Sequence, residues 1–220
     1  MAVGYNPSIV SDGLVFYIDA ANLRSYSGSG VTANGLIGGI NGTLVNGVGF
    51  TSSNNGSFVF DGTNDYVDCG YNSNINNATQ LTIECWYRSS NISKEGIIFG
   101  TNSFFPAYGY HMEIYQSKLL FQVFPSTSSV QSSITLSNNI WYHLVGTYNS
   151  GTINLYVNGI SSGSGNYTYS ASSENLILGR YYAGSLSLEG QLSNVKFYNK
   201  ALSQQEILQN FNATRFRYGI

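Results

Sequence analysis

The chain has 220 residues, of which 42% are hydrophobic, 15% are aromatic and only 9% are charged, and its formal net charge is −2. Globular proteins carry roughly 25% charged residues and helical bundles carry more, so the composition excludes helical bundles and coiled coils. The near-neutral charge predicts no nucleic acid partner. Every apolar run falls short of the ~18 residues that span a membrane, so we expect no membrane insertion.

Short runs rich in Val, Ile, Tyr and Phe follow one another, separated by Gly, Asn, Asp and Ser. Gln80–Arg88 (QLTIECWYR) is the clearest, because every second residue from Leu81 to Tyr87 is apolar, which is the period of a half-buried strand. Asn158-Gly159 suits a two-residue hairpin turn. The predicted strands span residues 13–19, 57–60, 66–69, 80–88, 96–100, 108–115, 119–124, 129–136, 141–148, 152–157, 175–178 and 186–198.

One helix is predicted near the C-terminus. Ser203 and Glu206 have the spacing of a capping box, and an apolar face at helical spacing follows them. We expect the helix over about residues 203–210 and an extended tail over residues 211–220 that lies on its own domain or on a neighbour. The tail carries Arg215 and Arg217, too few cations to indicate nucleic acid binding.

The chain is predicted to form a single domain over residues 1–220, without a linker or an internal repeat. Residues 1–7 have neither a basic region nor an apolar stretch, so we expect no secretory signal. Synthesis in a reducing cytosol would leave Cys69 and Cys85 unpaired, as small buried hydrophobic residues.

Several blocks, in order, resemble the concanavalin A-like lectin/glucanase superfamily in its laminin-G and pentraxin-like form. They are residues 13–22 (GLVFYIDAAN), 41–46 (NGTLVN), 57–70 (SFVFDGTNDYVDCG), 81–88 (LTIECWYR), 139–160 (NIWYHLVGTYNSGTINLYVNGI), 176–180 (LILGR) and 190–206 (GQLSNVKFYNKALSQQE). The resemblance implies an all-β jelly-roll sandwich of two antiparallel sheets, each of six or seven strands. It also implies that the first strand, Leu14–Ile18, lies beside the last, Val195–Tyr198.

Some branches of this superfamily are glycoside hydrolases, which need two carboxylates flanking the scissile bond. The hydrolytic branch carries them on one strand as Glu-x-Asp-x-x-Glu, and no such string occurs here. Glu84 and Glu113 each stand alone in a predicted strand. We therefore predict a protein that is not an enzyme, and glycoside hydrolysis remains the weakest alternative.

The resemblance raises the question of calcium, which needs several oxygen ligands. Relatives hold a structural calcium with an aspartate after the first strand, a position that Asp19 matches. The acidic loop that completes such a site has lost its aspartate here. Asp61 could contribute to a structural calcium site, although the interpretation we favour is that its side chain caps its own turn.

Two loops of the related fold lie close together on the ligand-binding face. The corresponding segments here carry a cluster of aromatic and polar side chains, and aromatic rings stack on sugar rings while hydroxyl, imidazole and guanidinium groups supply hydrogen bonds. Packing in the core or in a subunit interface would explain the same residues. The predicted glycan-binding residues are Tyr108, Tyr110, His111, Arg180, Tyr181 and Tyr182.

The opening block and the ending, residues 211–220 (FNATRFRYGI), resemble a version of this domain found in structural proteins of tailed phages of marine bacteria and cyanobacteria. This predicts a non-enzymatic, lectin-like protein on the virion surface that attaches to glycans of the host cell. The alternative is a decoration or cement protein that contacts capsid or tail proteins, with no sugar site and with a homo-oligomeric assembly.

Overall fold

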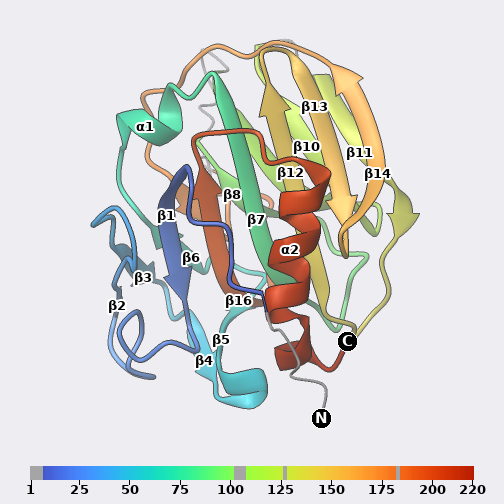
Figure 1. Ribbon diagram of the computed structural model, residues 1–220. Coiled ribbons are helices and arrows are strands. Elements are labelled where there is room, and N and C mark those ends of the chain that lie inside the picture. The colour runs from blue at the N-terminus through green and yellow to red at the C-terminus, as the bar shows by residue number, and fades with distance from the viewer. Residues whose placement is uncertain (1–6, 102–107, 126–127, 182–183) are drawn as a thin grey trace.

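A computed structural model of the chain describes residues 7–101, 108–125, 128–181 and 184–220. Two antiparallel sheets pack face to face and one helix of three turns lies near the C-terminus (Figure 1), which confirms the predicted jelly-roll sandwich. Each sheet has eight strands within the described residues, more than the six or seven that the resemblance implied. None of the described helices is long and apolar enough to span a membrane.

The first sheet has the strand order β14-β13-β12-β7-β16-β5-β4, and β1 also pairs with β16. Its strands are β1 (Leu14–Asp19), β4 (Gly49–Thr51), β5 (Ser57–Asp61), β7 (Gln80–Arg88), β12 (Tyr142–Asn149), β13 (Thr152–Val157), β14 (Ile160–Asn166) and β16 (Glu189–Tyr198). Ile18 pairs with Val195, so the predicted contact between the first and last strands is confirmed.

The second sheet has the strand order β11-β10-β9-β8-β15-β6-β3-β2. Its strands are β2 (Thr32–Ala33), β3 (Gly42–Val45), β6 (Tyr66–Asp68), β8 (Gly96–Gly100), β9 (Tyr110–Tyr115), β10 (Lys118–Val123), β11 (Ser128–Thr135) and β15 (Ile177–Leu178). The short elements between strands are the helix α1 (Ser73–Asn76) and the 3₁₀ turn η1 (Ser53–Asn55).

The main core lies between the two sheets and follows the alternation of the strands. In β7, every second residue from Leu81 to Tyr87 belongs to this core, as predicted. Trp86, on the opposite face, is also fully buried. The prediction of a half-buried strand was therefore wrong, because β7 is covered on both faces. Cys69 and Cys85 are buried and free, which confirms that they act as small hydrophobic residues.

The second cover of β7 comes from the C-terminal segment, which forms α2 (Gln204–Thr214) and then the 3₁₀ turn η2 (Arg215–Tyr218) across the outer face of the first sheet (Figure 1). Ser203 caps α2 and forms the predicted capping box with Glu206. The helix continues beyond residue 210, and the tail is helical rather than extended. The Tyr218 ring stacks on the Trp86 ring with 3.9 Å between centroids, a contact that the helical path makes possible.

Candidate functional site

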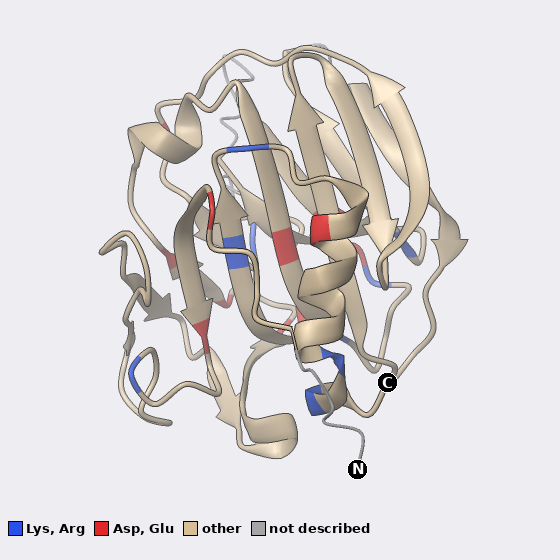
Figure 2. Ribbon diagram, viewed as in Figure 1, with Lys and Arg blue, Asp and Glu red and all other residues tan. Residues whose placement is uncertain are grey.

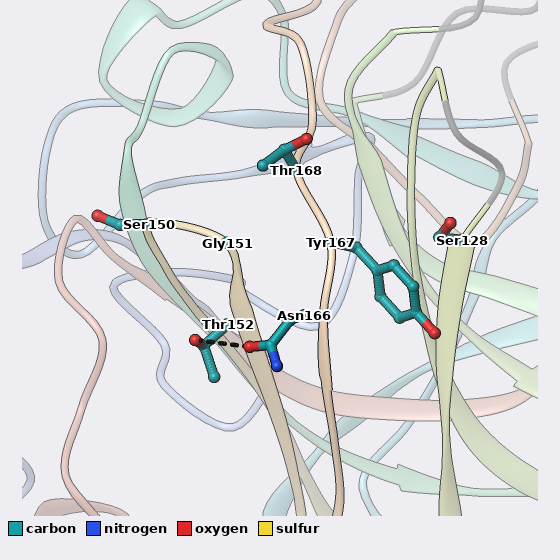
Figure 3. Close-up of a pocket in the computed structure, with 7 residues that line it drawn as sticks. All are labelled: Ser128, Ser150, Gly151, Thr152, Asn166, Tyr167 and Thr168. Carbon is teal, nitrogen blue, oxygen red and sulfur yellow. Dashed lines mark hydrogen bonds between the residues drawn. The ribbon is translucent and has the colours of Figure 1, made fainter.

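Two adjoining hollows form one groove at the end of the sandwich that carries α1, opposite the end that carries η2. Each has a volume of about 390 Å³, and both are lined by Ser150 and Thr168. We call this feature the rim groove (Figure 3). The first hollow is also lined by Ser128, Gly151, Thr152, Asn166 and Tyr167, and the second by Asn77, Ala78, Thr79, Tyr148, Tyr169 and Ala171.

The β12–β13 hairpin and the segment that leaves β14 hold the groove in shape. Ser150 and Gly151 make the hairpin turn with φ angles of 46° and 106°. The backbone N–H of Tyr167 donates to the Gly151 carbonyl over 2.6 Å, and the Thr152 hydroxyl donates to Asn166 Oδ1 over 3.1 Å. The groove is thus held by one backbone and one side-chain hydrogen bond between strand ends.

Buried aromatic packing supports the second hollow from below. The Tyr169 ring meets the Tyr148 ring edge to face, with 5.1 Å between centroids, and meets the Tyr110 ring in the same way at 5.2 Å. The Tyr169 hydroxyl donates to the Ala78 carbonyl. Edge-to-face pairs of this kind fix ring orientation. The floor of the groove is therefore continuous with the core.

The chemistry of the rim groove is neutral. Its lining consists of hydroxyl, amide, small and tyrosine side chains, and none of these lining side chains is an acid or a base that is charged at neutral pH. Hydroxyl and amide groups both donate and accept hydrogen bonds. Tyr167 has 36% of its surface exposed, so its ring is available to a ligand. Such a lining can bind an uncharged ligand rich in hydroxyl groups.

The rim groove was not predicted from the sequence. Asn149-Ser150-Gly151 is recognisable as a hairpin turn, and the polar run Asn166–Tyr169 (NYTY) begins at the end of β14, the second strand after that turn. Two aromatic residues among hydroxyl and amide side chains, beside a turn, are a signal that could have indicated the groove. This signal can be interpreted only when the pairing of β13 with β14 is known, because that pairing places the polar run beside the hairpin turn.

Two of the predicted glycan-binding residues lie below the surface. Tyr110 has no exposed surface and donates a hydrogen bond to the Ile75 carbonyl over 2.7 Å, so the prediction that it contacts a ligand was wrong. It faces the core because β9 alternates and Met112 and Ile114 occupy the same face. His111 faces the other way but is only 2% exposed, and its Nε2 lies 3.6 Å from Glu113 Oε2.

The remaining predicted residues that the structure describes do not form one cluster. The Tyr181 ring meets the His111 ring edge to face at 6.1 Å, so these two residues do lie together. The Arg180 guanidinium instead stacks on Tyr66, a residue that the prediction did not include. Tyr108 is 38% exposed. Tyr182 lies outside the described residues.

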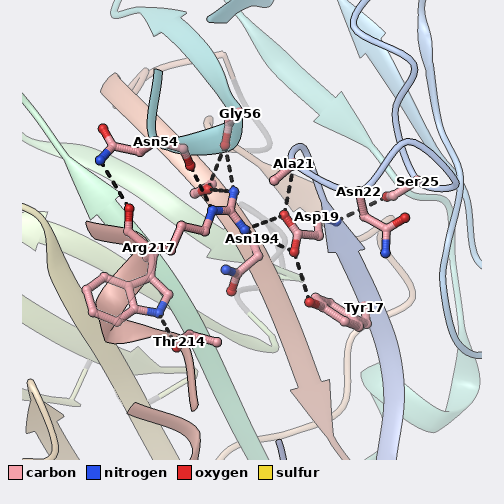
Figure 4. A network of polar contacts seen from close by, with 12 residues as sticks. Tyr17, Asp19, Ala21, Asn22, Ser25, Asn54, Gly56, Asn194, Thr214 and Arg217 are labelled. Atoms are coloured by element: carbon pink, nitrogen blue, oxygen red, sulfur yellow. Dashed lines mark hydrogen bonds and ion pairs between the residues drawn. The ribbon is translucent and has the colours of Figure 1, made fainter. Parts of the chain in front are cut away.

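Asp19 does not have the surroundings of a calcium ligand. Its carboxylate accepts hydrogen bonds from Arg217 Nη1, over 2.8 and 3.1 Å, from the Tyr17 hydroxyl and from the backbone N–H of Ala21 (Figure 4). The guanidinium supplies the positive charge that a metal ion would bring, so these residues do not fit calcium.

Asp61 caps its own turn, which is the interpretation that the sequence favoured. Its Oδ1 accepts a hydrogen bond from the backbone N–H of Thr63 over 2.7 Å. Within the described ranges, no group of three or more His, Cys, Asp or Glu side chains is arranged to hold a metal ion.

A buried ionic network lies under α2, away from both the rim groove and the outer face of the second sheet. Charged residues are few in the surrounding strands (Figure 2). Glu84 and Lys196 have no exposed surface, and Lys196 Nζ lies 2.6 Å from Glu84 Oε1. Asn210 of α2 donates to Glu84 Oε2 over 2.6 Å, and His143 Nε2 lies 3.2 Å from Glu84 Oε1. No ligand can reach Glu84 without displacing α2, so this network is structural.

Solved structures with the same architecture include domains of toxins and of a sialidase. The binding domain of Paraclostridial mosquitocidal protein 1 superposes with a TM-score of 0.74 at 17% identity, over 91% of this chain and 52% of that one. Trypanosoma rangeli sialidase in complex with sialic acid superposes with a TM-score of 0.72 at 15% identity, over 96% of this chain and 34% of the sialidase chain. The receptor binding domain of botulinum neurotoxin type G superposes with a TM-score of 0.65 at 14% identity, over 91% of this chain and 51% of the neurotoxin chain.

At these identities the likeness shows the fold alone, and this chain spans about a third to a half of the length of those proteins. Among curated protein sequences, none matches this chain. The family model of the concanavalin A-like lectin/glucanases superfamily named Laminin_G_3 matches residues 61–208, which is more than half of the chain. With the two-sheet jelly roll, this match shows that the chain belongs to the concanavalin A-like lectin/glucanase superfamily.

Proposed function

We propose that this protein binds carbohydrate without cleaving it, and that an uncharged stretch of a glycan occupies the rim groove. The observation that carries the proposal is the lining of the groove, in which hydroxyl and amide groups surround the partly exposed ring of Tyr167 without a charged side chain. Two of the structurally similar domains are named as toxin binding domains, and the proposal gives this chain a binding role of the same general kind.

The groove has the size and chemistry for one or two sugar rings. Ligand sites usually enclose about 300–1,000 Å³, and each hollow has about 390 Å³. The apolar face of a sugar would lie on the Tyr167 ring, and its hydroxyl groups would exchange hydrogen bonds with Ser150, Asn166 and Thr168. Because such hydrogen bonds replace those with water, each contributes only about 1 kcal/mol. Repeated sugar units or several copies of the domain would raise the affinity.

A glycan array tests the proposal with a matched pair of variants. Tyr167→Ala removes an aromatic ring from the groove, whereas Phe216→Ala removes a ring that is 68% exposed at the opposite end of the molecule. We expect the wild type and Phe216→Ala to bind the same glycans, and Tyr167→Ala to lose about tenfold or more of the affinity. Equal binding by all three proteins would contradict the assignment to the groove. Absence of binding by folded wild-type protein would contradict the function.

The location and the protein partners that we propose for this chain rest on sequence resemblance. We propose that the chain is displayed on the virion surface of a tailed phage, anchored to capsid or tail proteins, and that its glycan partners lie on the host cell. Mass spectrometry of purified particles, from the phage whose genome encodes the chain, should detect it. Its absence from infectious particles would contradict this part of the proposal.

A further inference from the structure

Apart from the rim groove, a further hollow of about 340 Å³ lies on the outer face of the second sheet where β6 and β15 pair. Val67 of β6 and Leu178 of β15 point into the core, so their neighbours along the strands point outward. We call this feature the Arg180 hollow. It is lined by Tyr66, Asp68, Glu174, Asn175, Ile177 and Arg180.

The guanidinium of Arg180 is oriented by an aromatic ring, and within the described residues no hydrogen bond to it is found. Its central carbon lies 3.8 Å from the centroid of the Tyr66 ring, and its Nε is buried without a hydrogen-bond partner. None of the ion pairs among the described residues includes Arg180. By contrast, Arg217 meets a carboxylate, two carbonyls and a hydroxyl.

Neither acidic side chain of the hollow forms an ion pair with this cation. Asp68 is held by Asn175, whose Nδ2 lies 3.0 and 3.2 Å from the two carboxylate oxygens, and by the backbone N–H of Gly70 at 2.9 Å. Glu174 is fixed through its carbonyl, which accepts a 2.7 Å hydrogen bond from the buried Asn76. The hollow therefore contains a guanidinium that stacks on an aromatic ring and two carboxylates that do not form an ion pair with it.

We propose that Arg180 binds the carboxylate of an acidic sugar, while Asp68 and Glu174 accept hydrogen bonds from hydroxyl groups on the same ring. A guanidinium matches a carboxylate with two parallel hydrogen bonds, and stacking on Tyr66 orients it before the ligand arrives. The two acidic side chains repel a simple anion, because it brings no hydrogen-bond donors to offset that repulsion. They favour a ligand that carries hydroxyl donors next to its carboxylate.

This inference rests on the proposed carbohydrate-binding function but uses a separate surface. The segment between Tyr167 and Asn175 connects the two, because its beginning lines the rim groove and its end lines the Arg180 hollow. A glycan with neutral and acidic units could contact both. Each surface can be disabled without altering the other.

The test is titration of the intact protein with D-glucuronate, D-glucose and acetate, followed by NMR at the side-chain Nε–H of Arg180. We expect D-glucuronate to shift this signal and to bind about tenfold or more tightly than either D-glucose or acetate. Arg180→Ala should abolish the preference for D-glucuronate. Arg180→Lys should lose most of it, because an ammonium lacks the planar fork. Arg24→Ala, which removes a loop arginine, should retain it.

Three outcomes would overturn the inference. Equal responses to acetate and D-glucuronate would mean that the sugar ring has no role. Equal binding of D-glucuronate by the wild type and Arg180→Ala would place the carboxylate elsewhere. No response to D-glucuronate would overturn the inference alone if neutral glycans still bind at Tyr167, and would overturn the proposed function with it if no glycan binds. Melting temperatures of the variants separate these results from misfolding.

Discussion

Arg217 connects the end of the chain to three distant parts of the first sheet. Its Nη1 contacts the Asp19 carboxylate, its Nε and Nη2 donate to the carbonyls of Asn54 and Gly56, and Nη2 also donates to the Ser193 hydroxyl (Figure 4). Both side chains of the ion pair are mostly buried. Removing one member of a mostly buried ion pair is destabilising, because the remaining charge loses its hydrogen bonds and water cannot replace them.

Replacement of Arg217 should therefore be costly. We expect Arg217→Ala to lower the free energy of unfolding by about 3 kcal/mol, since it leaves Asp19 buried and unpaired. Arg24→Ala, in an exposed loop, should change it by less than about 0.5 kcal/mol. Urea denaturation of the three proteins measures the difference. Equal stability of Arg217→Ala and the wild type would show that the ion pair does not hold η2.

Glu84 gives the protein a dependence on pH. Burial alone would raise the pKa of this carboxyl, but Lys196 and His143 outweigh that effect and hold the pKa well below its ordinary value. A carboxyl with a lowered folded-state pKa contributes stability that is present above its unfolded pKa, about 4.3. That stability is lost as the pH falls toward the lower, folded-state pKa.

Glu84→Gln tests this contribution, because it removes the charge and keeps nearly the same shape. At pH 7 we expect the variant to be less stable than the wild type by about 3 kcal/mol, since Lys196 loses its partner. The difference should shrink as the pH falls below about 4, because Glu84 then takes up a proton in the unfolded wild-type chain, whereas the folded state keeps the carboxylate ionised. A difference that is the same at pH 7 and pH 3 would contradict the account of Glu84.

At the scale of elements, the start of the C-terminal helix α2 could be predicted from local sequence, but its end could not. The capping box predicted where α2 begins, because Ser203 and Glu206 act on each other within one turn. Its end could not be predicted, because residues 211–218 follow a helical path only to place Phe211 and Tyr218 against Trp86. Those contacts join parts of the chain that are far apart in sequence.

Two aromatic residues of η2 provide an internal comparison for this packing. Tyr218 is 6% exposed and its hydroxyl accepts a 3.0 Å hydrogen bond from Asn194, whereas Phe216 is 68% exposed. Tyr218→Ala should lower the free energy of unfolding by about 3 kcal/mol. Phe216→Ala should lower it by less than about 0.5 kcal/mol. Similar effects of the two substitutions in calorimetry would mean that η2 does not pack on Trp86.

β14 explains why the rim groove escaped prediction. Its sequence, ISSGSGN, lacks the apolar alternation of a strand, and it forms because β13 provides a partner along its whole length. Gly163 is needed there, because a side chain at that position would come within 2.9 Å of the Gln131 carbonyl. Without β14 the sequence gives no reason to place Asn166 and Tyr167 beside the β12–β13 turn.

At the scale of the molecule, the sandwich itself could be predicted because its signals are local and repeated. Alternation in β7, the β13–β14 turn at Asn158 and the family motifs all agree on two antiparallel sheets. The proposed binding surfaces depend instead on which strand ends and loops come together in the fold. Arg180 was identified from the sequence, but Tyr66, on which it stacks, and Asp68, which lines the same hollow, come from β6, which becomes its neighbour only through pairing with β15.

The central claim is that this jelly roll binds glycans at the rim groove. The most direct measurement is chemical-shift mapping of the wild-type protein with the tightest-binding neutral glycan from the array. We expect the backbone signals of residues 150–152 and 166–169 to shift together in a saturable manner and to give one dissociation constant. Shifts confined to other surfaces, with none along these two segments, would contradict the claim.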